Sequence, residues 1–134
     1  MMWSALQKIP YSIRLSAAII WGVAIPVLSL LPARFFRQAH ELVHFPQASK
    51  VVHAIMYAIM TSLLLWVSSV PGRPLRMRSA CLAASAAVAY GLLMELLQHF
   101  TSSRTMSLWD GLADAVGAFL AVGIALCVAR LFGE

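Results

Sequence analysis

The chain has 134 residues, of which 61% are hydrophobic and 11% are charged, and its mean hydropathy is +0.83. Soluble domains carry roughly 25% charged residues, so this composition excludes a soluble domain and indicates a membrane protein. The net charge of +5 does not indicate nucleic-acid binding, because the basic residues lie in the connections between apolar segments, where they orient helices and contact lipid headgroups.

Four apolar segments are long enough to cross a hydrocarbon core about 30 Å thick. They cover residues 15–31, 51–70, 80–100 and 107–131. Together they take up most of the chain and leave no room for a second folded domain. The sequence therefore predicts an all-α fold, a four-transmembrane-helix membrane bundle, organised as a single membrane domain over residues 1–134.

The connections between these segments have distinct compositions. Residues 1–14 form a basic, amphipathic lead-in, and the segment that follows is longer than the apolar region of a signal peptide, so we expect a retained helix. Residues 33–49 mix aromatic and charged side chains, which is typical of a segment lying in the membrane interface. Residues 71–74, Pro-Gly-Arg-Pro, predict a turn.

The distribution of lysine and arginine predicts which side of the membrane each connection faces. The N-terminal part, the connection after residue 70 and the C-terminal part hold Lys8, Arg14, Arg73, Arg76, Arg78 and Arg130. The opposite side holds Arg34, Arg37, Lys50 and Arg104. The excess on the first side predicts that both termini are cytoplasmic.

Polar residues, which are costly inside a membrane, gather near one end of the last three segments. We predict that they form one extracytoplasmic binding pocket, because the orientation above places all of them at the same depth. The residues are Lys50, His53 and Tyr57 at the start of the second segment, Glu95 and Gln98 at the end of the third, and Arg104, Ser107, Asp110 and Asp114 around the start of the fourth.

Each group has the spacing of one helix face, but structural roles are also open for some of its members. Lys50 would then extend to the headgroups, and Glu95 with Gln98 would clamp the bundle. Ser107 is a suitable N-cap for the last helix. Asp114 lies too deep in that helix to be explained by capping.

Small residues recur at every fourth position in the last two segments, a spacing that lets helices approach closely in lipid. They are Ala83, Ala87 and Gly91 in one segment and Ala113, Gly117, Ala121 and Ala125 in the other. We expect these faces to bring the last two helices together, and with them their polar ends.

The chemistry of a mixed nitrogen and oxygen metal site is available from His53, Glu95, Asp110 and Asp114. Lys50 and Arg104 in the same layer would repel a divalent cation and pair with the carboxylates, so we expect no metal ion and no cofactor. Cys81 and Cys127 lack the spacing of metal ligands and are expected to be small buried residues. The serines show no nucleophile elbow.

The ordered motifs resemble those of the VanZ-like family of small bacterial membrane proteins. In this chain they read Lys50-x-x-His53-x-x-x-Tyr57, Gly91-x-x-x-Glu95-x-x-Gln98 and Arg104-x-x-Ser107-x-x-Asp110, with Gly117 following. The resemblance covers about residues 49–118. Two positions depart from the family pattern: Ser49 stands where relatives often have Asp, and Asp114 stands where Asn is usual.

The resemblance implies a multi-pass protein of the bacterial inner membrane that acts in the cell envelope. The founding member of the family is associated with resistance to teicoplanin, an antibiotic that carries a lipid chain. The implied partner is a membrane lipid, a lipid-linked envelope precursor or a lipoglycopeptide. Self-association into a homo-oligomer stays open.

The leading hypothesis is that the pocket recognises or processes an anionic, lipid-linked envelope molecule. Lys50, His53 and Arg104 would supply positive charge and hydrogen-bond donors. His53 and Glu95 are the candidates for acid and base if the chain is an enzyme, which the sequence leaves open. The alternatives are a small proton-coupled transporter and a structural accessory subunit of an envelope complex.

Overall fold

The computed structural model describes residues 2–30, 48–100 and 108–131. These residues form helices joined by turns, and the predicted all-α class is confirmed. The helices are α1 (Met2–Gln7), α2 (Tyr11–Leu30), α4 (Ala48–Ser68), α5 (Met77–His99) and α6 (Leu108–Leu131).

Four of these helices, α2, α4, α5 and α6, are long and apolar enough to cross a membrane. They contain 20, 21, 23 and 24 residues, and about 20 residues are needed to cross the hydrocarbon core. Each helix corresponds to one predicted segment, although α2 already begins at Tyr11. The four helices support the prediction of a multi-pass membrane protein.

The turn between α4 and α5 lies where the Pro-Gly-Arg-Pro sequence predicts it. The backbone N–H of Arg73 donates a hydrogen bond to the carbonyl of Val70 at 3.1 Å. Gly72, inside this turn, has a φ angle of +74°, which strains residues with a Cβ atom. The turn therefore depends on glycine at this position.

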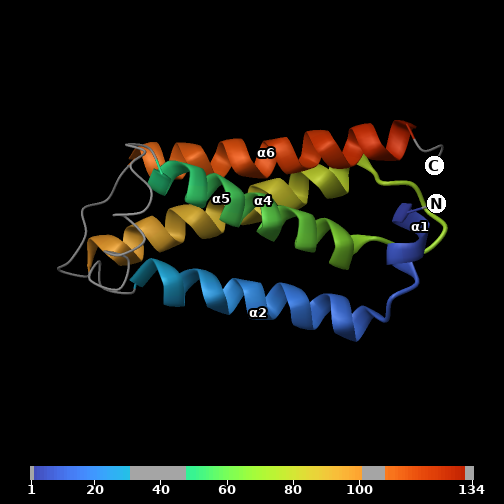
Figure 1. Ribbon diagram of the computed structural model, residues 1–134, viewed down its shortest axis with the longest axis horizontal. Helices are drawn as coiled ribbons and strands as arrows, with labels where there is room; N and C mark the ends of the chain where they lie inside the picture. Colours follow the sequence, from blue (N-terminus) through green and yellow to red (C-terminus); the bar gives the residue numbers. More distant parts are fainter. Residues whose placement is uncertain (1, 31–47, 101–107, 132–134) are drawn as a thin grey trace.

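The four long helices lie side by side in the bundle (Figure 1). α1 and the end of α6 lie at one end, which we call the α1 end. The start of α4, the end of α5 and the start of α6 lie at the opposite end, which we call the polar end. α4 is the central helix, because it packs against α2, α5 and most extensively α6.

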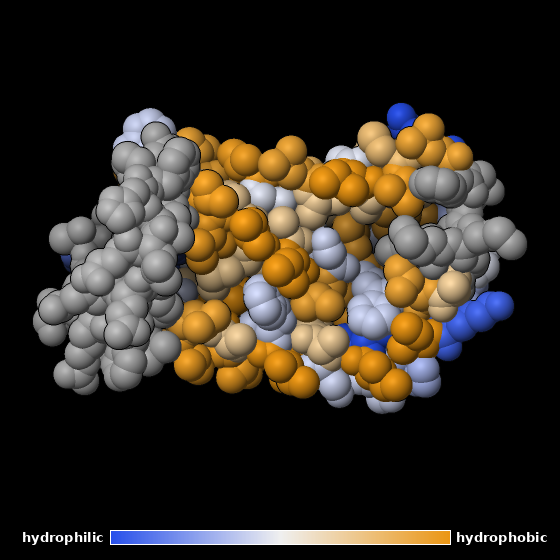
Figure 2. Space-filling view, in the orientation of Figure 1, coloured by the Kyte–Doolittle hydropathy of each residue, from blue (hydrophilic) through white to orange (hydrophobic). Residues whose placement is uncertain are grey.

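The outer surface of the bundle is apolar along most of its length, and Figure 2 shows apolar side chains over the middle of one face. Ile20 on α2, Leu82 on α5 and Ile124 on α6 are more than half exposed. This is the surface expected of helices surrounded by lipid. Cys81 and Cys127 also lie on the outside, so the expectation that they are buried is wrong.

The interior contains many small residues, as expected for helices that associate by close contact in lipid. Ala80, Ala84 and Ala87 of α5 and Ala118 of α6 are fully buried. They pack with larger core residues such as Leu65 of α4. Large side chains mostly point outward, so the bundle is held together by backbones that approach one another closely.

The closest approach involving the small residues of α6 is to α4. A Cβ atom added at Gly117 would overlap the carbonyl oxygen of Ala54 and would lie 2.7 Å from its carbonyl carbon. The sequence predicted that this face would approach the preceding helix, α5, which also packs against α6, but the closest approach at Gly117 is to α4. The difference arises because spacing defines a helix face but does not define which neighbour that face meets.

The α1 end is organised around Arg14, which is buried although it is charged. Its Nη1 donates to the backbone carbonyls of Trp66 at 2.8 Å and Ser69 at 2.9 Å, and to the Ser69 hydroxyl at 2.9 Å. These carbonyls belong to the end of α4, where the last turn of a helix leaves acceptors unpaired. Arg14 therefore caps α4 from the neighbouring helix α2.

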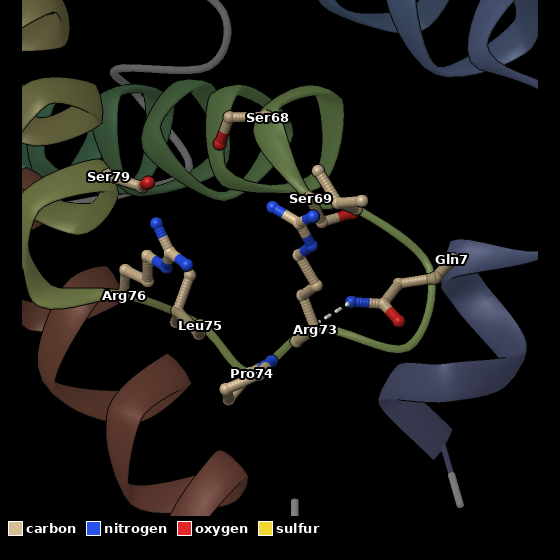
Figure 3. A pocket seen from close by; sticks show the side chains of 9 residues that line it. Gln7, Ser68, Ser69, Arg73, Pro74, Leu75, Arg76 and Ser79 are labelled. Atoms are coloured by element: carbon tan, nitrogen blue, oxygen red, sulfur yellow. Dashed lines mark hydrogen bonds between the residues drawn. The ribbon is translucent and has the colours of Figure 1, made fainter.

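Gln7 attaches α1 to the turn between α4 and α5. Its Nε2 donates to the carbonyl of Arg73 and its Oε1 accepts from the N–H of Gly72, both at 3.3 Å. Figure 3 shows the Gln7 side chain reaching from α1 to this turn, beside a small cavity of about 130 Å³ into which Arg76 also projects. The same contacts fix the short helix α1 against the bundle.

Candidate functional site

The polar end brings together residues from three helices. His53 lies in the second turn of α4, Glu95 in the last turns of α5, and Asp110 in the first turn of α6. One ligand-type atom from each of these three side chains lies within 4.8 Å of those of the other two. We call His53, Glu95, Asp110 and Asp114 the polar cluster.

The best-defined contact of the polar cluster joins His53 and Asp114. The Nδ1 atom of His53 lies 3.0 Å from Oδ1 of Asp114. Asp114 is buried, with 1% of its surface exposed, and an ionised carboxylate at such a position requires a hydrogen-bonding partner. His53 supplies this partner, and its Nδ1–H is the donor when Asp114 is ionised.

Gly91 of α5 makes room for this pair. A Cβ atom at Gly91 would lie 2.7 Å from Oδ2 of Asp114 and 3.2 Å from ring atoms of Tyr57. Tyr57 is itself almost fully buried. The glycine of the Gly91-x-x-x-Glu95 motif therefore shapes the wall of the polar cluster.

Glu95 and Gln98 are both buried in α5, at the spacing that places them on one face. Gln98 Nε2 donates to the carbonyl of Ser29 on α2 at 3.3 Å, and both residues take part in further polar interactions. Gln98 therefore joins α5 to α2 in the way expected of a structural clamp. Glu95 belongs to the polar cluster, beside His53 and Asp110.

Lys50 adopts a position that the sequence did not predict. Its Nζ atom lies 5.7 Å from the centroid of the Trp109 ring, within the range of a cation–π interaction. Trp109 is in the first turn of α6, next to Asp110. A tryptophan at a helix end is typical of an anchor at the membrane interface. The position of Trp109 in the sequence does not identify it as the partner of Lys50.

Seven of the nine predicted pocket residues lie in the described part of the chain. Asp110 is partly buried and belongs to the polar cluster, and the positions of the other six are given above. Arg104 and Ser107 lie outside the described residues. Their predicted roles in the pocket stay predictions.

Two further hydrogen bonds between the helices were not predicted from the sequence. Trp21 Nε1 donates to the carbonyl of Met56 at 3.0 Å, and the hydroxyl of Tyr90 donates to the carbonyl of Gly22 at 2.6 Å. Both bonds position α2, against α4 and α5 respectively. Aromatic residues with a polar atom commonly find such partners when they are buried, but the sequence does not show which carbonyl they reach.

An apolar groove lies on the outer side of α4 and α6, next to the polar cluster. Its volume is about 430 Å³, and its lining includes Val51, Ile55, Ala58 and Ser62 of α4 together with Leu120 and Ile124 of α6. Ala54 and Gly117 also line it. Ala54 directly follows His53, and Gly117 comes one helical turn after Asp114. The groove therefore lies on two of the three helices that form the polar cluster.

The comparisons with known proteins agree with the motifs. The family model described as VanZ/LLP1 matches residues 1–130, which is nearly the whole chain and extends well beyond the motif-bearing residues 49–118. Searches of curated proteins and of solved structures found no match. The residues that carry the motifs meet at the polar end wherever the structure describes them, and the chain belongs to the VanZ/LLP1 family.

Proposed function

We propose that this protein binds an amphiphilic molecule of the bacterial cell envelope within the inner membrane. The polar head of the molecule would bind at the polar cluster, and its hydrocarbon chain would lie in the groove between α4 and α6. The observation that carries the proposal is that the two helices lining the groove, α4 and α6, also carry His53 and Asp114 of the polar cluster.

The dimensions of the groove suit a hydrocarbon chain. Its lining on α4 extends from Val51 to Leu65, and a separation of 14 residues along a helix corresponds to about 21 Å. One leaflet of a bilayer has a hydrocarbon thickness of about 15 Å, half of the core. A single lipid tail therefore fits along the groove while its head reaches the level of His53.

The polar end supplies groups that bind a polar head. Among the described residues these are the imidazole of His53, the ammonium of Lys50 beside Trp109, and the carboxylates of the polar cluster. The excess of basic residues at the α1 end supports an orientation in which the polar end faces outward. A lipid-linked envelope precursor or a lipoglycopeptide such as teicoplanin has the required combination of a polar head and an apolar chain.

This proposal can be tested by filling the groove with a larger side chain. Ala58→Trp places a large side chain in the lining, whereas Val52→Trp places the same side chain on an exposed position of α4 outside it. We expect Ala58→Trp to lower the amount of co-purified amphiphile, measured by native mass spectrometry, by at least about tenfold, equivalent to about 1.4 kcal/mol. Val52→Trp should bind as much as the unmodified chain.

A second arm tests the polar head. Glu95→Gln and Arg104→Ala should abolish any protection of cells against teicoplanin while membrane expression is maintained. Full protection in both variants, together with unchanged lipid binding in Ala58→Trp, would contradict the proposal. If a bound amphiphile is consumed by the purified protein and this turnover is lost in His53→Ala, the site catalyses a reaction with His53 and Glu95 as acid and base.

A further inference from the structure

We propose that His53, Glu95 and Asp110 form a binding site for one divalent transition-metal ion, of which Zn²⁺ and Mn²⁺ are the natural representatives. The three side chains come from three different helices, and their ligand-type atoms lie within 4.8 Å of one another. The site concerns residues of this chain alone, so it is testable without any lipid.

The spacing is close to that of a bound ion. Zinc binds histidine nitrogen and carboxylate oxygen at roughly 2.0–2.2 Å, so ligand atoms around a tetrahedral ion are separated by about 3.5 Å. Rotations of the Glu95 and Asp110 side chains close a difference of about 1 Å without moving the helices. Glu95 has other polar interactions in the structure, which the ion would share or replace.

Asp114 would not bind the ion itself but would hold the His53 ring in place. A histidine that binds a metal ion commonly donates its other ring N–H to a carboxylate, which fixes the tautomer and the direction of the ring. The 3.0 Å contact of His53 Nδ1 with Asp114 Oδ1 is such a contact, and it leaves Nε2 as the ligand nitrogen. Asp114 is therefore a positioning residue for the proposed ion.

The charges of the polar end favour a cation. The polar cluster holds three carboxylates and one imidazole, and its surroundings in the membrane have a low dielectric constant, where uncompensated negative charge is costly. The expectation that no metal binds rested on Lys50 and Arg104 lying in this layer. The structure places the Lys50 ammonium over the Trp109 ring, so Lys50 counts less against a bound cation. Arg104 lies outside the described residues.

The ligand types indicate which ions suit the site. Imidazole suits zinc and iron, and carboxylates suit Mn²⁺, whereas Mg²⁺ and Ca²⁺ prefer oxygen ligands alone. Three protein ligands leave at least one coordination position open, as in catalytic zinc sites. A phosphate or carboxylate oxygen would occupy this position, which would explain how an acidic cluster holds an anionic head group; this last step rests on the proposed function.

The test measures metal binding by the full chain, purified in mild detergent after removal of its affinity tag. Equilibrium dialysis against Zn²⁺ or Mn²⁺, followed by elemental mass spectrometry, should give one ion per chain. His53→Ala, Glu95→Gln and Asp110→Asn should each lower the affinity by more than the roughly 10–100-fold that loss of an outer-shell partner costs, and Asp114→Asn should lower it within that range.

The matched control removes the other three histidines of the chain, His40, His44 and His99. A chain with all three replaced by Ala should still bind one ion with unchanged affinity. Asp110 is only partly buried, so Asp110→Asn remains informative if Glu95→Gln fails to fold. The proposal is overturned if the unmodified chain binds no ion, if the triple variant loses it, or if His53→Ala and Asp110→Asn retain it with full affinity.

Discussion

Asp114 and Gly91 show how single residues define the polar end. Asp114 is the deepest carboxylate of the polar cluster, and it is accommodated only because Gly91 presents no side chain toward it. A buried hydrogen bond contributes little net stability, but removal of one partner is costly because the other is left unsatisfied. The pair is therefore better explained by a role in orienting His53 than by a role in folding.

Replacement of glycine by alanine at positions 91 and 117 should destabilise the protein by different amounts. At Gly117 the added methyl group would meet the backbone of Ala54, which cannot move independently of α4, whereas at Gly91 it would meet the Asp114 side chain, which can rotate. We expect Gly117→Ala to cost about 1–3 kcal/mol of unfolding free energy and Gly91→Ala to cost less, as measured by denaturant titration in detergent micelles.

Gly123 provides the control for this pair. A Cβ atom at that position would have no neighbour within 4 Å, so Gly123→Ala should leave the unfolding free energy unchanged or slightly raised. Equal effects of alanine at positions 117 and 123 would contradict the close approach of α4 and α6.

The sequence predicted which residues share the polar end, but not how they pair. His53, Glu95 and Asp110 each lie near one end of an apolar segment. Helices of similar length that cross the same membrane bring these ends to one depth. The contact of Lys50 with Trp109 depends on the rotation of α4 relative to α6. That rotation is set by packing of the whole bundle, which no local pattern describes.

Among the helices, the contact between α2 and α4 at the α1 end is the most unexpected. The sequence assigns Arg14 to a basic lead-in that orients the protein, whereas the structure buries it and uses it to cap the end of α4. Trp66 of α4 in turn donates its Nε1–H to the carbonyl of Leu6 at 2.8 Å. α1, α2 and α4 are thus joined at one end by side chains that bond to backbone carbonyls.

Replacement of Arg14 should therefore destabilise the bundle. Arg14→Gln removes the charged donor for the carbonyls of Trp66 and Ser69, and a hydrogen bond to a charged group contributes about 1.5–3 kcal/mol. Thermal unfolding in detergent should reveal the loss as a lower midpoint. Arg130→Gln, at an exposed position near the end of α6, changes the net charge equally and should leave the midpoint unchanged.

The existence of the four membrane helices followed from length and apolarity alone, because these properties do not depend on tertiary contacts. Length and apolarity do not show which faces of these helices contact one another. The small-residue face of α6 meets α4 at Ala54, although its spacing is equally suited to α5. Residues 1–14 likewise had the composition of an interfacial segment, but Gln7 and Arg14 are buried against the bundle.

For the whole molecule, the distribution of basic residues makes a topological prediction. α1 and the end of α6 lie at the same end of the bundle (Figure 1), which carries most of the lysine and arginine residues, and such residues favour the cytoplasmic side. A green fluorescent protein fused to the C-terminus should fluoresce, and alkaline phosphatase fused there should be inactive. The reverse pattern would place the polar end in the cytoplasm and would contradict recognition of an envelope molecule from outside.

Because Gly117 lies directly against the carbonyl of Ala54, α4 and α6 form a seam along which neither helix can slide. His53 precedes Ala54, and Asp114 lies one turn before Gly117. Both side chains are therefore attached next to the point where α4 and α6 approach most closely. A hydrocarbon chain that binds in the groove as proposed would therefore lie against two helices held at a fixed spacing.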